Sequence, residues 1–185
     1  MNGYGRGGWW AAVNQLWSAT RIEKRVLGVR SDLDRLPFPE NFYDGVLSVH
    51  ALRNMKIQDR SQNISNLVKA LKPGGLLLIS EFSPEACSEP QQILLELFSM
   101  KTRLTGGEYP LPTETELISY IEATGLEIEC VSKLDLRINE PIWSFNINAQ
   151  NISQGDRQRY HTLIEKGMKI GIKTSPTIIV CGRKK

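Results

Sequence analysis

The chain has 185 residues and a net charge of +3, with basic and acidic residues interspersed. It is long enough for one domain with a sizeable core, and no run approaches the ~18 apolar residues of a membrane span. The one locally basic stretch is residues 182–185, so the sequence predicts no nucleic-acid partner and no membrane association. Three cysteines without Cys-x-x-Cys spacing, and no opening signal-peptide pattern, predict free thiols, no metal site and a cytoplasmic protein.

The first residues are rich in glycine. Gly3, Gly5 and Gly7 form Gly-x-Gly-x-Gly, and with Gly8 the stretch also satisfies the dinucleotide pattern Gly-x-Gly-x-x-Gly. Glycines in such a loop let the backbone turn sharply and approach a ligand without a Cβ in the way. An amphipathic pattern over residues 9–20 predicts a helix whose N-terminus would face that ligand. The alternative interpretation is a flexible tail.

The middle of the chain predicts a β-α-β unit. Residues 45–49 and 76–79 are apolar except for Ser48, as in strands of a parallel sheet that is covered on both faces. Residues 72–75, Lys-Pro-Gly-Gly, are typical of a helix end. The apolar residues between the strands recur at helical spacing: Ile57, Ile64, Leu67, Val68 and Leu71.

The second half predicts further helices and two strands. A helical pattern includes residues 93–100, and a capping box of Thr113 and Glu116 opens another helix that ends at Gly125. Strands are expected at residues 127–134 and 177–181. The connection between them, residues 138–173, is longer than a hairpin turn and contains a polar helix near residues 156–166. Cys130 and Cys181 fall in the two strands and are expected to be small core residues.

Residues 32–82 resemble the second half of a class I S-adenosylmethionine (SAM) dependent methyltransferase with a type 11 domain. The resemblance lies in Leu36-Pro37-Phe38 ahead of Asp44, and in Leu71-Lys72-Pro73-Gly74-Gly75 ahead of the next strand. Residues 51–54 and 81–83 resemble, more narrowly, the ubiquinone/menaquinone C-methyltransferases. The resemblance implies an α/β fold with a Rossmann-like, mostly parallel sheet and an antiparallel last strand. It also implies a single domain over residues 1–185, in which the insertion 138–173 could cover the substrate or decorate the sheet edge.

The resemblance further implies where SAM would bind. Asp32 and Leu33 would meet the adenine, although Asp32 could instead cap a turn. His50 ends a strand, where ligands bind in open α/β sheets, and could accept a proton from the substrate or serve as a packing residue. The implied cofactor-binding residues are Gly3, Gly5, Gly7, Asp32, Leu33, Ser48 and His50.

The predicted function is SAM-dependent methyl transfer to a small-molecule acceptor, a reaction in which the enzyme mainly binds, aligns and desolvates. Two departures from the family pattern leave alternatives open. No strand precedes Gly3, and residues 26–29 leave room for one strand only before Asp32. If this is the family's second strand, Arg30 stands where an acid would help to bind ribose, and if it is the third, the second strand is missing. The chain is therefore expected to be truncated or compressed and to lack one or two N-terminal strands. It could instead be a non-catalytic binding or scaffold module that completes its sheet as a homo-oligomer. A nicotinamide-dependent enzyme is the third hypothesis.

Overall fold

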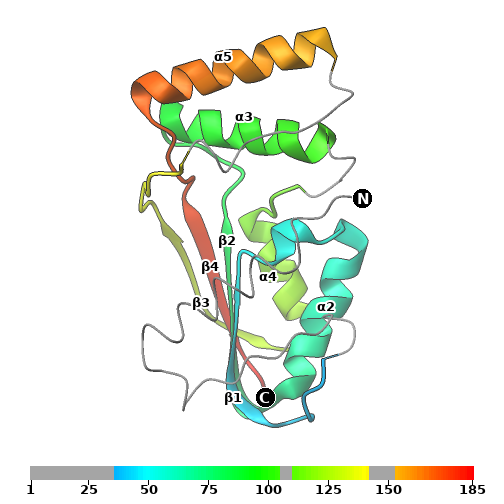
Figure 1. Cartoon of the computed structure of the whole chain (residues 1–185). Coiled ribbons are helices and arrows are strands. Elements are labelled where there is room, and N and C mark those ends of the chain that lie inside the picture. The colour runs from blue at the N-terminus through cyan, green and yellow to red at the C-terminus, as the bar shows by residue number, and fades with distance from the viewer. Residues whose placement is uncertain (1–35, 105–109, 142–152) are drawn as a thin grey trace, which may run out of the picture. The chain divides into compact units, whose positions relative to one another are not determined.

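The computed structural model describes residues 36–104, 110–141 and 153–185. In these residues a mixed sheet has the strand order β1-β2-β4-β3, and helices lie against it and beyond one end (Figure 1). The strands are β1 (Tyr43–Val49), β2 (Leu71–Phe82), β3 (Glu127–Leu134) and β4 (Thr177–Arg183). The helices are η1 (Leu52–Asn54, a 3-10 turn), α2 (Ile57–Ala70), α3 (Glu89–Leu104), α4 (Glu114–Glu122) and α5 (Gln154–Ile170).

The pairing of the strands confirms the predicted order of elements. β1 and β2 are parallel, as a β-α-β unit requires. β4 is antiparallel to both β2 and β3, so the last strand of the chain is inserted between its neighbours as expected. The predicted parallel character holds for β1 and β2, whereas the other two described ladders are antiparallel.

The Lys-Pro-Gly-Gly segment lies at the start of β2 instead of ending the helix. Helix α2 already ends at Ala70, and the ladder with β1 shifts between the pairs Tyr43–Leu71 and Gly45–Leu76. Gly74 has a φ of 78°, which favours glycine, and a Cβ on Gly75 would lie 2.9 Å from the carbonyl oxygen of Lys72. The segment is therefore an irregular entry into the strand, and both glycines are required by its shape.

One face of the sheet carries the main core, under α2 and α4. Gly182 of β4 lies directly under α4, since a Cβ there would come within 2.6 Å of the Ile121 side chain. Ile57 does not belong to this core, because 49% of it is exposed, so the predicted apolar stripe begins later in the helix. The buried core residues are Leu52, Ile64, Val68, Leu71, Leu77, Ile79, Leu117, Ile121, Leu126, Ile178 and Val180.

The opposite face of the sheet carries the alternate residues of each strand. Leu47 and Val49 of β1 are 65% and 51% exposed. On the same face, Cys130 is exposed and Cys181 is half-buried. The prediction that both cysteines are core residues is wrong for Cys130, because core positions on β3 and β4 are those that face α4.

A second apolar cluster joins α3 and α5, which lie side by side beyond the end of β2 (Figure 1). Gly167 allows the close approach of Ile172, whose Cγ1 would be 2.8 Å from a Cβ at this position. The second cluster is formed by Ile93, Leu94, Leu97, Met100, Leu163 and Ile172.

Helix α4 begins with the predicted capping box, in which Thr113 and Glu116 bond each other's backbone N–H.

Candidate functional site

The candidate site is built where the parallel strands β1 and β2 end together. His50 follows β1 directly, and its backbone N–H donates to the Ser80 carbonyl at 2.8 Å, which extends the ladder by one bond. His50 then turns the chain with a φ of 50°, an uncommon conformation for a residue with a side chain. The Asn54 amide donates to the His50 carbonyl at 3.1 Å and helps to hold this turn. The fold therefore fixes His50 at the carboxyl edge of the sheet.

The His50 ring packs against aromatic and cationic neighbours. Its centroid lies 4.1 Å from that of Phe82, at an interplanar angle of 34°. The Arg53 guanidinium carbon lies 4.9 Å from the Phe82 ring and 5.8 Å from the Phe98 ring, within the range of cation–π attraction. We call His50, Arg53, Phe82 and Phe98 the aromatic platform.

The imidazole of His50 is neutral at physiological pH. Burial lowers its pKa to about 4, and the nearby charge of Arg53 acts in the same direction. Its Nδ1 atom is buried and has no hydrogen-bond partner in the described residues. A group with this pKa is a weak proton acceptor at pH 7, since efficient general bases have pKa values near the working pH. The geometry suits ring packing or contact with a ligand, and a catalytic role of His50 stays a prediction.

Two buried charged residues hold the η1 turn that carries Arg53. The carboxylate Oε1 of Glu81 accepts from the backbone N–H of Leu52 at 2.6 Å. Arg60 of α2 donates from Nε to the Leu52 carbonyl at 3.2 Å and from Nη2 to the Pro110 carbonyl at 2.5 Å. Both side chains have 0% exposure. Burial raises the pKa of Glu81. The hydrogen bond from Leu52 and the charges of Arg53 and Arg60 act in the opposite direction, but burial is the larger effect. Glu81 and Arg60 thus form a clamp on both backbone groups of Leu52.

Unpaired polar atoms concentrate at this end of the sheet. Within the described residues, the buried side-chain atoms without a partner are His50 Nδ1, Arg60 Nη1, Glu81 Oε2 and Ser175 Oγ. Buried polar groups are hydrogen-bonded in most proteins, so such atoms need an explanation. Three of the four belong to the platform or to the clamp, which agrees with a place where polar ligand groups bind.

The predicted site residues divide into those that the structure describes and those outside it. Gly3, Gly5, Gly7, Asp32 and Leu33 all lie outside the described residues, so their predicted roles stay predictions.

Ser48 is described and is 7% exposed. Along β1 it shares a side with Val46, which packs against the core under α2 and α4, and it points away from the side of Leu47 and Val49. Its contact with a cofactor also stays a prediction.

The sequence patterns do not single out the clamp. Glu81 belongs to the resemblance of residues 81–83, and Arg60 belongs to no predicted motif. Arg60 lies three residues after Ile57 and four before Ile64, on the helix side that otherwise carries apolar residues. A charged residue in such a stripe is a signal of a buried, bonded cation that could have been found.

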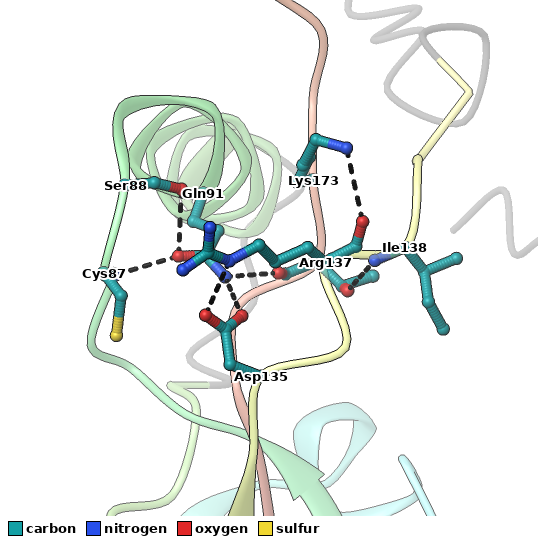
Figure 2. Close-up of polar contacts among 8 residues, drawn as sticks. Cys87, Ser88, Gln91, Asp135, Arg137, Ile138 and Lys173 are labelled. Carbon is teal, nitrogen blue, oxygen red and sulfur yellow. Dashed lines mark hydrogen bonds and ion pairs between the residues drawn. The ribbon is translucent and has the colours of Figure 1, made fainter.

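A third polar cluster fixes the two ends of the insertion (Figure 2). Gln91 at the start of α3 accepts from the Cys87 backbone N–H and the Ser88 hydroxyl, and donates to Asp135 at 2.7 Å and to the Thr174 carbonyl at 2.9 Å. The Thr174 backbone N–H donates to the Ile138 carbonyl at 2.8 Å, the Ile138 N–H donates to the Thr174 hydroxyl at 3.0 Å, and Asn139 and Lys173 form an isolated bridge. Gln91 uses all of its bonding capacity, so this cluster is structural. The predicted insertion, residues 138–173, is closed at its base, whereas its role as a substrate cover stays a prediction.

In the part of the chain that the structure describes, no three His, Cys, Asp or Glu side chains gather as a metal ion would require. Among residues 36–104, 110–141 and 153–185, no helix has the length and apolar character to cross a membrane.

The chain is similar in sequence to known methyltransferases. Residues 11–79 match the methyltransferase domain family. The ubiquinone/menaquinone biosynthesis C-methyltransferase UbiE of Pseudomonas paraeruginosa is 42% identical over 71 residues, which are 36% of this chain and 27% of that protein. The chain covers about a quarter of the length of the first curated relatives that it matches.

The fold is also similar to solved structures. A SAM-dependent methyltransferase from Archaeoglobus fulgidus matches with a TM-score of 0.52 at 18% identity, covering 90% of this chain and 71% of that one. The [4+2]-cyclase SpnF matches with a TM-score of 0.58 at 20% identity, covering 94% and 61%. These structures define an open α/β sheet of the Rossmann-like methyltransferase type. With the family match, the chain is similar to class I SAM-dependent methyltransferases in sequence over residues 11–79 and in its fold.

Proposed function

We propose that this protein binds SAM and transfers its methyl group to a small-molecule acceptor. The match of residues 11–79 to the methyltransferase domain carries the proposal, because a fold alone does not define a reaction. The similarity to the [4+2]-cyclase SpnF illustrates this point. The aromatic platform adds support, since it lies beyond the carboxyl ends of β1 and β2, where open α/β sheets bind ligands.

The described residues fit a SAM site at its acceptor side. When bound, SAM would supply an electrophilic methyl group on a sulfonium. A neutral His50 adds no like charge beside that cation, and its unpaired Nδ1 can accept a hydrogen bond. Burial lowers the pKa of Arg53, and the electrostatic interactions of its guanidinium with Glu81 and Glu140 act against this shift. In this proposal the chain binds, orients and excludes water, and Gly3, Gly5, Gly7, Asp32, Leu33 and Ser48 supply the rest of the cofactor site.

An aromatic, quinol-like ring is the acceptor class that we propose. The relative from Pseudomonas paraeruginosa is named for ubiquinone and menaquinone biosynthesis. The platform offers the imidazole of His50 and the cation of Arg53, both packed on the buried Phe82 ring, and such groups attract aromatic rings and phenolic oxygens. We place the activity in the cytoplasm because the described cysteines are free. Pairing of two copies through the sheet edge stays a prediction.

Isothermal calorimetry with SAM tests the cofactor step. We expect saturable binding by the full chain, and no heat at millimolar SAM would overturn the proposal in favour of a non-catalytic binding module. Transfer of labelled methyl from SAM to a reduced 1,4-naphthoquinone that lacks the ring methyl tests the acceptor step. SAM binding without transfer to this probe would reject the acceptor class but leave the cofactor in place. A surface variant, Lys72→Ala, serves as a control, because in the part of the chain that the structure describes the Lys72 side chain pairs with exposed Asp44.

A further inference from the structure

Two cysteines face each other across the antiparallel ladder of β3 and β4. Cys130 and Cys181 are direct register partners. Both lie on the sheet face opposite α4, where Cys130 is exposed and Cys181 is half-buried. The ladder shifts between Ile128 and Cys130, so the pair lies beside a bulge.

The register brings the two thiols within the reach of a covalent bond. Directly opposite residues in antiparallel strands have Cα atoms about 4.5–5.5 Å apart. Disulfides join Cα atoms that are about 4.4–6.8 Å apart. Side chains of such a pair point to the same side of the sheet, so no change of strand register is needed to bring the sulfur atoms together.

We propose that Cys130 and Cys181 form a dithiol site that is oxidised reversibly to a cross-strand disulfide by a small disulfide such as oxidised glutathione. This inference does not depend on methyl transfer.

The reaction proceeds by two exchanges. Cys130, the more exposed thiol, loses its proton, and its sulfur attacks the glutathione disulfide, forming a mixed disulfide and releasing one glutathione thiolate. Cys181 then loses its proton and attacks the Cys130 sulfur, which releases the second glutathione. The two cysteines together lose two electrons and two protons, and one glutathione disulfide becomes two thiols.

The surroundings of Cys181 set the speed of the second exchange. Burial raises the pKa of the Cys181 thiol, and the neighbouring Cys130 and Glu129 act in the same direction, whereas Arg183 opposes them. Glu129 and Arg183 form an ion pair beside the two thiols. Because the thiolate is the attacking species, ring closure should accelerate as the pH rises from about 7 to about 9.

The disulfide would close the chain from β3 to β4 around the whole insertion. The loop includes α5 and ends at neighbouring strands. A cross-link over a loop of this length restricts the unfolded chain, so Tm is expected to rise by about 5–10 °C on oxidation and to return on reduction.

The experiment uses the full chain, reduced and then incubated at low protein concentration with oxidised glutathione. Intact mass spectrometry should show a loss of about 2 Da, from the two hydrogens. Alkylation and peptide mapping should show Cys130 linked to Cys181, with Cys87 still free. Cys87→Ser is the matched control and should keep the loss, whereas Cys130→Ser and Cys181→Ser should each abolish it.

Three results would overturn the proposal. One is a stable glutathione adduct on Cys130 without ring closure at any pH up to about 9. Another is a link that involves Cys87, and the third is a disulfide-bonded dimer as the sole product. Cys130→Ser replaces an exposed side chain, so a folded variant is available even if Cys181→Ser proves unstable.

Discussion

Replacement of Glu81 tests the buried clamp that holds the turn of the candidate site. Glu81→Ala removes the side-chain acceptor that the Leu52 backbone N–H has within the described residues. Glu81→Gln keeps an oxygen at this position but removes the charge. The two variants therefore separate the hydrogen bond from the carboxylate.

The expected difference between the two variants follows from the burial of this bond. Glu81 is 0% exposed and Leu52 is 1% exposed, so water cannot replace the lost acceptor without rearrangement. A buried donor left without a partner costs about 1–3 kcal/mol. We expect Glu81→Ala to be less stable than Glu81→Gln by this amount at pH 7, with a further loss for the space that the shorter side chain leaves.

The charge of Glu81 adds a dependence on pH. Burial raises the folded-state pKa of this carboxyl above its unfolded value. The stability that this shift contributes is fully present below the unfolded pKa and is lost as the pH rises through the folded pKa. Since Gln does not titrate, wild type should lose stability relative to Glu81→Gln as the pH rises through this range.

Urea unfolding followed by circular dichroism measures both effects. Curves for wild type, Glu81→Gln and Glu81→Ala at several pH values between about 4 and 8 give the free energies of unfolding. The reasoning is refuted if Glu81→Ala and Glu81→Gln are equally stable at pH 7. The account of the charge is refuted separately if the gap between wild type and Glu81→Gln is independent of pH.

Two further predictions follow from close packing and from the burial of His50. Gly182→Ala should destabilise the fold by about 1–3 kcal/mol in urea unfolding, because its Cβ would lie 2.6 Å from the Ile121 side chain. Gly155→Ala, with open space around it, should be nearly neutral. Equal effects of the two substitutions would contradict the packing account. His50 should titrate near pH 4 in NMR spectra of the ring protons. The chain has two histidines, so the His161→Gln variant leaves only the His50 signal and thereby identifies it. An apparent pKa of His50 near 6.5 would show that the imidazole is not buried as described.

Local patterns were sufficient where neighbouring residues decide the structure. The strand at residues 127–134 and the capping box of Thr113 and Glu116 were predicted correctly, because the signals are local. Alternation within a strand, in contrast, does not reveal which face receives helices. For this reason the position of Cys130 was predicted wrongly, although its strand was right.

By itself, the sequence determined the order of the elements and the resemblance of residues 32–82 to class I methyltransferases. Apolar periodicity, glycine and proline positions and capping residues are properties of short segments, so they can be recognised without knowledge of the fold. Only the tertiary structure decided which side chains meet. Glu81 and Arg60 come from a strand and a helix, and they meet at Leu52 because β1 and β2 end at the same edge. Contacts of this kind depend on long-range packing, which no local pattern encodes.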